Sequence, residues 1–225
     1  MVQIGFLEFL GYREWTESLG HDREWYIQAT QAKLYQINQL FTSQYEGLVL
    51  PLRYDMQLMI LPPEIDRERY VKGLIEALKP YTPTEVSIEL MCGPIPGVLE
   101  RRNNDREKCG GKVAVFHADL NYFTQRTKEV GPYLTYLEIL DVVHEYAMSL
   151  KEAAIVQYLG GDNLAVIAEK EKLSSVINEL VKRKGIKIGI GISHSPRKAF
   201  ALAAKSLGVI RKEGRVRTYL IEEDS

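Results

Sequence analysis

Two short acidic segments contain the residues of this chain that could do chemistry. Asp162 lies in the turn Gly160–Asn163, between two apolar runs, and Asp119 follows closely on the apolar run Val113–Phe116. Gly and Asn tolerate the positive φ values of tight turns, so we expect the first segment to be the tip of a β-hairpin. Two carboxylates in contact repel each other unless a hard cation such as Mg²⁺ lies between them. A metal site is therefore predicted if the two aspartates meet.

The elements around the two aspartates could bring them together. In a β-α-β-β unit the first strand lies beside the hairpin, so the end of that strand faces the hairpin turn. Asp119 would end the first strand and Asp162 would lie in the turn. Taken alone, each aspartate is better explained by backbone preference, because Asp is favoured in Gly-Asp turns and before helices. A metal site and a purely structural role therefore both stay open.

Four residues near this pair are predicted nucleotide contacts. Gly160 and Gly161 leave backbone N–H groups open to phosphate oxygens. Asn121 and Thr124 have the donors and acceptors to recognise a purine edge. The alternatives are an ordinary tight turn for the glycines and a polar loop at a helix entry for the other two. On spacing alone these alternatives are the simpler explanation.

Three further residues could serve the same site. His117 alternates with Asp119, so it either shares that strand face or caps the strand, and it is the nearest titratable candidate for acid–base catalysis. Lys205 and Arg211, on the last predicted helix, could contact phosphate. They are six positions apart, hence on different faces of an ideal helix. Cations near a helix C-terminus are also usual on a solvated face, where they suit the helix dipole.

The composition excludes several classes of protein. The chain has 225 residues, 45% hydrophobic and 26% charged, as in a globular protein with a proper core. Its net charge of -1 predicts no nucleic-acid partner. No signal peptide is expected, and no apolar run approaches the roughly 20 residues of a membrane span. Cys92 and Cys109 have neither metal-ligand nor redox spacing, so we expect a cytoplasmic chain with reduced thiols.

Hydrophobic periodicity predicts one order of elements twice, namely strand, helix, two strands, helix and strand. The first predicted helix carries an apolar stripe of Ile27, Leu34, Ile37 and Phe41. Ser195 and Pro196 are expected to be the N-cap and first residue of a last helix, which a final strand follows. The predicted strands cover residues 2–10, 48–52, 56–61 and 86–90 in the first half, and 112–119, 154–159, 164–168, 186–192 and 216–221 in the second.

The predicted fold class is α+β, with two tandem ferredoxin-like (palm) domains whose antiparallel sheets carry helices on one face. We predict an N-terminal palm-like domain over residues 1–93, a linker over 94–111 and a C-terminal palm-like domain over 112–225 with the metal and nucleotide site. Aligning the two hairpins sets Asp55 over Asp162, which agrees with an internal duplication.

The second half resembles the diguanylate cyclase domain with its Gly-Gly-Asp hairpin. The similarity is carried by Asp119, by the hairpin, by 203–207 and by Gly214–Arg217. The cyclase hairpin continues with a catalytic Glu, where this chain has Asn163. That departure argues against cyclase chemistry.

A set of short motifs extends over nearly the whole chain. They are Val2-Gln3-Ile4, Tyr12, Trp15-Thr16, Leu34-Tyr35, Gly47-Leu48-Val49, Arg53-Tyr54-Asp55, His117-Ala118-Asp119-Leu120-Asn121, Thr124, Gly160-Gly161-Asp162-Asn163, Gly189-Ile190-Gly191-Ile192 and Ile210-Arg211. Each motif is weak alone, but together they are fairly specific. They give a closer resemblance, to the archaeal GTP cyclohydrolase III family, which also has an Asn after Gly-Gly-Asp.

This resemblance implies a hydrolase that converts GTP into 2-amino-5-formylamino-6-ribosylaminopyrimidinone 5′-monophosphate and two phosphates, for flavin and deazaflavin biosynthesis. It also implies a homo-oligomer, a dimer or tetramer. Mg²⁺ would be held by Asp119, Asp162 and the Leu120 carbonyl, and Asn163 would join the nucleotide contacts. A requirement for a monovalent cation such as K⁺ stays open. The alternatives are a nucleotidyl cyclase and a non-catalytic GTP-binding palm protein.

The sequence departs from the family in two places. The first strand of the family ends in Asp-Asn, but the corresponding positions here are Leu10 and Gly11, so we expect a carboxylate to be missing from the first half. The segment between the halves is also shorter. A single working site in the second half is therefore predicted.

Overall fold

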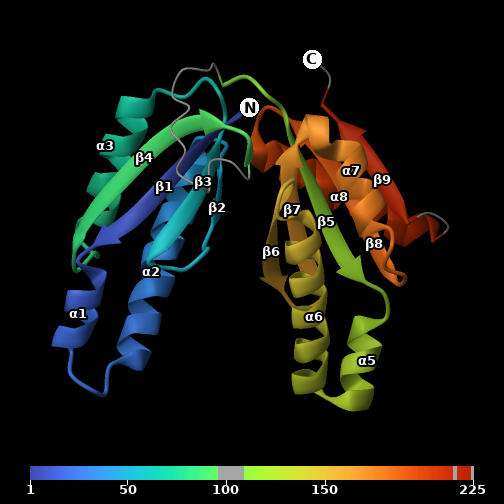
Figure 1. The fold of residues 1–225 in the computed structure, drawn as a ribbon, viewed down its shortest axis with the longest axis horizontal. Helices are drawn as coiled ribbons and strands as arrows, with labels where there is room; N and C mark the ends of the chain where they lie inside the picture. The colour runs from blue at the N-terminus through green and yellow to red at the C-terminus, as the bar shows by residue number, and fades with distance from the viewer. Residues whose placement is uncertain (96–108, 215–216, 224–225) are drawn as a thin grey trace. The chain divides into compact units, whose positions relative to one another are not determined.

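The computed structural model describes residues 1–95, 109–214 and 217–223 (Figure 1). The chain divides into two compact units. We call the one built on Val2–Gly93 the N-terminal unit and the one built on residues 110–223 the C-terminal unit. Most of the predicted linker, 94–111, lies outside the described residues. No helix among the described residues is long and apolar enough to cross a bilayer.

The N-terminal unit is a four-stranded antiparallel sheet in the order β2-β3-β1-β4. The core lies between this sheet and helices α2 and α3, where side chains such as Leu7, Met59 and Leu74 are fully buried. The elements are β1 (Val2–Leu10), α1 (Tyr12–Ser18), α2 (Glu24–Gln44), β2 (Leu48–Leu50), β3 (Met56–Leu61), α3 (Arg67–Leu78) and β4 (Glu85–Gly93).

The buried face of α2 differs in part from the predicted stripe. Ile37 and Phe41 pack against the core without being fully buried, whereas Asn38 and Thr42 are fully buried. Asn38 donates to Gln57 Oε1 at 2.8 Å, and Thr42 donates to Asn38 Oδ1 at 2.8 Å. Apolar periodicity missed this part of the face because buried polar groups are tolerated once they are hydrogen-bonded.

The C-terminal unit is a five-stranded sheet in the order β6-β7-β5-β8-β9, in which only the β8–β9 pair is parallel. Ser195 caps α8 by accepting from the Lys198 N–H, and Pro196 starts the helix, as predicted. The elements are β5 (Val113–Leu120), α5 (Phe123–Val130), α6 (Pro132–Leu150), β6 (Ala154–Gly160), β7 (Asn163–Glu169), a 3₁₀ turn (Lys170–Lys172), α7 (Leu173–Leu180), β8 (Ile186–Ser193), α8 (Pro196–Glu213) and β9 (Thr218–Glu222).

Helices cover both faces of the C-terminal sheet. Phe116 and Ala118 on β5 belong to the core that α6 and α7 close. The opposite face meets α8 at Gly189 and Gly191, where an added Cβ would stand 2.2 Å from the Ala203 carbonyl oxygen and 2.0 Å from that of Ala199. The predicted ferredoxin-like fold class is confirmed. The predicted placement of helices on one face alone is wrong for this unit, because alternate glycines on β8 admit a helix on the second face.

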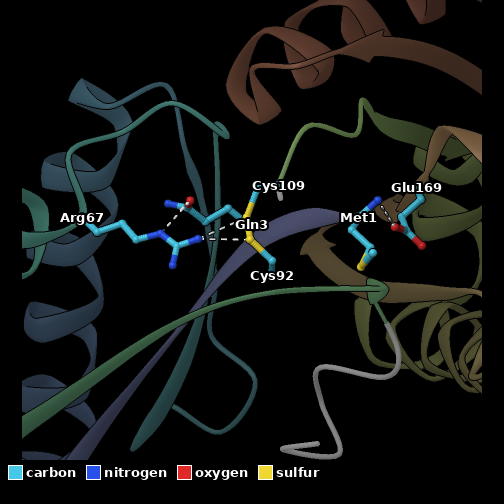
Figure 2. The surroundings of a disulfide bond; sticks show 6 residues. All are labelled: Met1, Gln3, Arg67, Cys92, Cys109 and Glu169. Atoms are coloured by element: carbon cyan, nitrogen blue, oxygen red, sulfur yellow. Dashed lines mark hydrogen bonds and ion pairs between the residues drawn. A yellow bond between two sulfur atoms is a disulfide. The ribbon is translucent and has the colours of Figure 1, made fainter. Parts of the chain in front are cut away.

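The expectation of reduced thiols is also wrong. Cys92 and Cys109 form a disulfide with a Cα–Cα distance of 5.4 Å (Figure 2). Arg67 Nη2 lies 3.1 Å from the sulfur of Cys92 and 3.3 Å from that of Cys109, and Arg67 Nε donates to Gln3 Oε1 at 3.2 Å. Spacing along the chain carried no sign of this pair, because the fold alone brings the end of β4 to residue 109.

Candidate functional site

The structure brings Asp119 and Asp162 together. β5 pairs with β7 so that Asp119 stands opposite Asn163, and the Leu120 N–H donates to the Asp162 carbonyl at 3.4 Å. Asp119 is buried, with 6% of its surface exposed. Burial and then the neighbouring Asp119 carboxylate raise the pKa of Asp162. The strand end and the hairpin turn therefore form one acidic pair.

Arg211 offsets part of the negative charge of this pair. It lies in the last turn of α8, and its Nε donates to Asp119 Oδ2 at 2.8 Å while Nη2 contacts the same oxygen. The guanidinium also acts to lower the pKa of Asp162. A cation is thus already present where two carboxylates meet, as the repulsion between them requires.

His117 is joined to the acidic pair through Asn163. Its Nε2 lies 3.0 Å from Asn163 Oδ1, and Asn163 Nδ2 donates to Asp162 Oδ1 at 2.7 Å. Because the Asn163 amide donates to Asp162, its oxygen faces His117 and accepts from Nε2–H. His117 Nδ1 is then an acceptor, and it is buried with no hydrogen-bond partner among the described residues. Burial lowers the pKa of His117, so the imidazole is neutral at pH 7.

The β6–β7 turn is the predicted hairpin, and it is open. Gly160 and Gly161 have φ values of 105° and 60°, which L residues rarely adopt. A Cβ built on either glycine meets no heavy atom within 4 Å in the part of the chain that the structure describes. Tyr158 holds the turn by donating its hydroxyl to the Gly161 carbonyl at 3.2 Å. A bulky anion could therefore approach this backbone closely.

A cavity of about 660 Å³ begins beside the acidic pair, at the end of β5. Asn121 and Gly185 both line it, and the Asn121 N–H donates to the Gly185 carbonyl at 2.8 Å. The Asn121 Oδ1 atom is buried with no hydrogen-bond partner among the described residues. The polar side chains that line the remainder come from α5, α6 and the turn before β8 and are Gln125, Arg126, Glu129, Glu138, Asp141, Arg183 and Lys184.

Two predicted contacts lie apart from this arrangement. Thr124 is exposed on α5 and does not line the cavity. Lys205 is exposed on α8, and within the described ranges no hydrogen bond or ion pair joins it to the acidic pair. Conversely, sequence reasoning missed Lys187, which stands opposite Asp119 in the β5–β8 ladder. The alternation Ile186-Lys187-Ile188 could have revealed it as the polar side of a buried strand.

The expectation that the first half lacks a carboxylate is wrong, because Glu8 occupies the position in the sheet that corresponds to Asp119. Glu8 stands opposite Met56 as Asp119 stands opposite Asn163, and the Phe9 N–H donates to the Asp55 carbonyl at 3.2 Å. Glu8 and Asp55 are therefore the counterparts of Asp119 and Asp162. The linear comparison placed the position two residues later, at Leu10, because strand register cannot be read from one sequence.

The residues of the C-terminal site fit a magnesium ion by donor type. Among the described residues there is no group of three or more His, Cys, Asp or Glu side chains able to hold a metal. Two carboxylates and the Leu120 carbonyl are nevertheless what Mg²⁺ commonly takes from a protein, since it keeps waters and binds substrate phosphates as well. All of these donors are hard oxygens.

Two tandem ferredoxin-like units, one of them with an acidic pair beside an open glycine hairpin, define a protein of the palm class. The family model of GTP cyclohydrolase III matches residues 2–102 and 96–224. The chain belongs to the GTP cyclohydrolase III family, which confirms the resemblance seen in the sequence.

Relatives of the same description support this assignment over almost the full chain. The GTP cyclohydrolase III of Aeropyrum pernix is 37% identical over 226 residues, covering 94% of this chain and 93% of the relative. That of Saccharolobus solfataricus is 34% identical over 236 residues, covering 99% of this chain and 100% of the relative. Among solved structures, the GGDEF domain of YfiN from Pseudomonas aeruginosa matches 56% of this chain and 86% of its own, at 18% identity and a TM-score of 0.45.

Proposed function

We propose that the chain opens the imidazole ring of GTP and releases two phosphates. One observation carries the proposal, namely the acidic pair of Asp119 and Asp162 at the Gly-Gly-Asp-Asn hairpin of a member of the GTP cyclohydrolase III family. Each phosphoanhydride bond that breaks takes one water, and C8 of the base takes another. The C8–N9 bond then breaks, and the formyl group stays on N7. The product is the formylamino-pyrimidinone ribosyl monophosphate.

Asp119, Asp162 and the Leu120 carbonyl would hold Mg²⁺. When bound, this ion would supply Lewis-acid stabilisation of the charge that develops on phosphate oxygens. Burial and then the neighbouring Asp119 carboxylate raise the pKa of Asp162, and Arg211 offsets only part of the charge of the two carboxylates, so a divalent cation would complete the neutralisation. A monovalent cation such as K⁺ is a separate requirement that the same assay can test.

The phosphates would bind between the hairpin and α8. The N–H groups of Gly160 and Gly161 lie on an open turn, and Arg211 can exchange the Asp119 carboxylate for phosphate oxygens. A guanidinium that moves from carboxylate to phosphate keeps its charge paired in both states. Lys205 stays a predicted phosphate contact for the same chemical reason.

The base would enter the cavity beside β5. Asn121 Oδ1 is a buried acceptor in need of a donor, and the carboxylates of Glu138 and Asp141 accept hydrogen bonds at the cavity wall. The guanine edge presents N1–H and N2–H donors, which suit these acceptors. A polar wall of this kind favours guanine over adenine, because adenine offers no N1–H and no N2 amino group.

His117 is the candidate general base for the water that attacks C8. Its imidazole is neutral, its Nε2–H is held by Asn163, and its Nδ1 lone pair is uncommitted within the described structure. A group with this protonation can take a proton from water at neutral pH. Asn163 is then a positioning residue, because it fixes the tautomer of His117 rather than touching the reacting atoms.

Incubation with GTP tests the proposal directly. We expect two orthophosphates per GTP, loss of the guanine absorption profile as the ring opens, and no turnover when EDTA removes divalent ions until Mg²⁺ is returned. Release of pyrophosphate would instead support a nucleotidyl cyclase. GTP that binds and is recovered unchanged would support a non-catalytic GTP-binding protein. The same assay with and without K⁺ measures the requirement for a monovalent cation.

A further inference from the structure

Lys187 is a half-buried cation on an interior strand of the C-terminal sheet. Strand β8 lies between β5 and β9, so both of its edges are paired. The isoleucines of β8 are buried in the core that α6 and α7 close, and the alternate residues Lys187, Gly189 and Gly191 therefore face α8. The two glycines leave room for the helix. Lys187 is thus the charged side chain of a row that otherwise serves helix packing.

The neighbour of Lys187 across the sheet is an acidic residue of the candidate site. Lys187 stands directly opposite Asp119 in the β5–β8 ladder. Directly opposite residues of an antiparallel pair point to one face, with Cβ atoms about 5 Å apart. Helix α8 crosses β8 at Gly191 and then at Gly189, and its last turn brings Arg211 to Asp119. Asp119 therefore has two cations beside it, one from a strand and one from a helix.

These two cations differ in their pairing. Arg211 Nε donates to Asp119 Oδ2 at 2.8 Å. Among the residues that the structure describes, none accepts a hydrogen bond from the Lys187 side chain or forms an ion pair with it. A half-buried ammonium group without a counter-ion costs free energy, because burial removes part of its hydration. A lysine in this position is therefore expected to serve an anionic ligand.

Lys187 and the cavity for the base lie on opposite faces of the C-terminal sheet. The cavity is lined by Leu120 of β5 and by side chains of α5 and α6. Lys187 lies on the face that α8 covers, as does His117, whose ring centroid lies 5.4 Å from that of Phe200 on α8. A nucleotide with its base in the cavity must cross the end of β5, at the acidic pair, before it reaches Lys187. The phosphates farthest from the base are therefore the ones that can meet this lysine.

We propose that Lys187 binds the two outermost phosphates of GTP, which are the two that the reaction releases. This inference rests on the proposed function, because it assigns a residue to the phosphate site of that function. The charges of the site agree with it. Arg211 and a divalent cation would more than offset the two carboxylates, so Lys187 adds to a positive charge that the phosphates can neutralise.

Such a contact would favour the substrate over the product. The ring-opened product keeps a single phosphate, so the Lys187 ammonium loses its partner once the other two phosphates leave. An interaction made with the triphosphate and absent from the monophosphate weakens product binding without weakening substrate binding. Lys187 would thereby assist the release of the product.

Binding of tripolyphosphate tests the proposal without any turnover, because this ion has the phosphate chain of GTP and no base. In calorimetric titrations at fixed free Mg²⁺, Lys187→Met should weaken tripolyphosphate binding by about 10- to 100-fold, since a charged hydrogen bond is lost. The same variant should bind GMP within about twofold of the wild-type affinity, because GMP lacks the outer phosphates. Lys187→Arg keeps the positive charge and should recover most of the tripolyphosphate affinity.

Lys172→Met is the matched control. Lys172 is exposed on the 3₁₀ turn, and that turn adjoins the start of β5 rather than its end, because the Lys170 N–H donates to the Lys112 carbonyl at 3.0 Å. The control removes the same charge from the same unit and should leave tripolyphosphate binding unchanged. Thermal melts check that each variant folds, and Lys187→Gln takes the place of Lys187→Met if the latter does not.

Two kinds of result would overturn the proposal. The first is a wild-type chain that does not bind tripolyphosphate, or a Lys187→Met variant that binds it as tightly as the wild type. The second is an equal loss of affinity for tripolyphosphate and GMP, which would show that Lys187 has a structural role. Phosphate release from GTP, measured in parallel, separates this inference from the proposed function. Binding that depends on Lys187 without turnover of GTP would refute the function alone, whereas turnover with Lys187-independent binding would refute the phosphate contact alone.

Discussion

The two units share a strand order and a register, yet their hairpins differ. Glu8 and Asp55 stand in the N-terminal unit where Asp119 and Asp162 stand in the C-terminal unit. The residue that enters the next helix is left-handed in both, with φ of 70° at Gly11 and 60° at Tyr122. Matching backbone therefore places an acidic pair in each unit. The acidic pair alone does not make the two units equivalent.

Three features set the C-terminal pair apart. Its hairpin has Gly160 and Gly161 where the N-terminal hairpin has Arg53 and Tyr54, and Arg53 Nη2 pairs with the Asp55 carboxylate at 2.9 Å. Its second sheet face carries α8, which delivers Arg211 to Asp119. Its cavity opens at the end of β5. The C-terminal unit therefore combines an open approach for an anion, the guanidinium of Arg211 and a cavity for the base.

The largest expected effect comes from the acidic residues themselves. Asp119→Asn should lower kcat/KM for phosphate release from GTP by about 10²- to 10³-fold, because it removes half of the charge that would hold Mg²⁺. Glu8→Gln is the matched change in the N-terminal unit and should alter the rate by less than about twofold. Phosphate release at fixed Mg²⁺ measures both. Equal losses would mean that the two units share the chemistry, and full turnover of Asp119→Asn would remove the metal assignment.

The contact between α8 and β8 should also be sensitive to substitution, and the effect should appear in the free energy of unfolding rather than in the rate. Gly189→Ala sets a Cβ 2.2 Å from the backbone oxygen of Ala203, so α8 must shift, at about 3 kcal/mol or more in the free energy of unfolding. Gly5→Ala in the N-terminal sheet meets the Leu90 Cδ2 and Met59 Cε atoms at 2.7 and 2.8 Å. These side-chain tips can move, so we expect about 1 kcal/mol. Urea titration compares the two, and equal costs would show that α8 yields easily.

The hairpins should respond to substitution with smaller effects. Gly161 has φ of 60°, so Gly161→Ala should cost about 1 kcal/mol of unfolding free energy and weaken GTP binding by adding a Cβ to the open turn. Tyr54 has φ of 44°, so Tyr54→Gly relieves strain while it loses the ring contact with Tyr35 at 6.0 Å. These changes oppose each other, and GTP binding should be unaffected. Calorimetric titration with GTP and thermal melts measure both, and equal losses of affinity would contradict a site in one unit.

The smallest expected effect is a dependence of stability on pH. The pKa of His117 is lower in the folded chain than its ordinary value near 6.5, so the unfolded chain binds the proton more readily. The free energy of unfolding should therefore fall as pH drops below about 6.5, and His117→Gln should lose that slope. His21→Gln, at an exposed position of the N-terminal unit, is the control and should keep it. Identical slopes for wild type and His117→Gln would show that another group is responsible.

Much of the fold follows from local signals in the sequence. The hairpin at Gly160–Asn163 was predicted because two glycines accept positive φ, and the start of α8 because Ser195 caps it and Pro196 fits its first turn. Apolar periodicity gave most of the order of the elements and most strand positions, but it did not predict the short helices α1 and α5. It failed on α2, where Asn38 and Thr42 are buried through hydrogen bonds that no hydropathy pattern records.

The candidate site was predicted in its parts more than in its assembly. Asp119, Asp162 and His117 were chosen from residue type and strand position, and the structure gathers all three. The contact of Arg211 with Asp119 spans 92 positions and depends on how α8 crosses the sheet. The cavity could not be foreseen, because its wall combines α5, α6 and the turn before β8. Thr124, chosen for its chemistry, lies outside that wall.

By itself the sequence determined the turn chemistry, most of the element order and the resemblance to a family, since each depends on neighbouring residues or on motifs. Tertiary structure alone decided that Asp119 meets Asp162 and that Glu8, rather than a residue at Leu10, is its counterpart. It also decided that Cys92 and Cys109 are joined. These outcomes depend on strand register and helix packing, which bring residues far apart in the chain into contact through burial and hydrogen bonding. Contacts of this kind cannot be read from the local pattern of a single sequence.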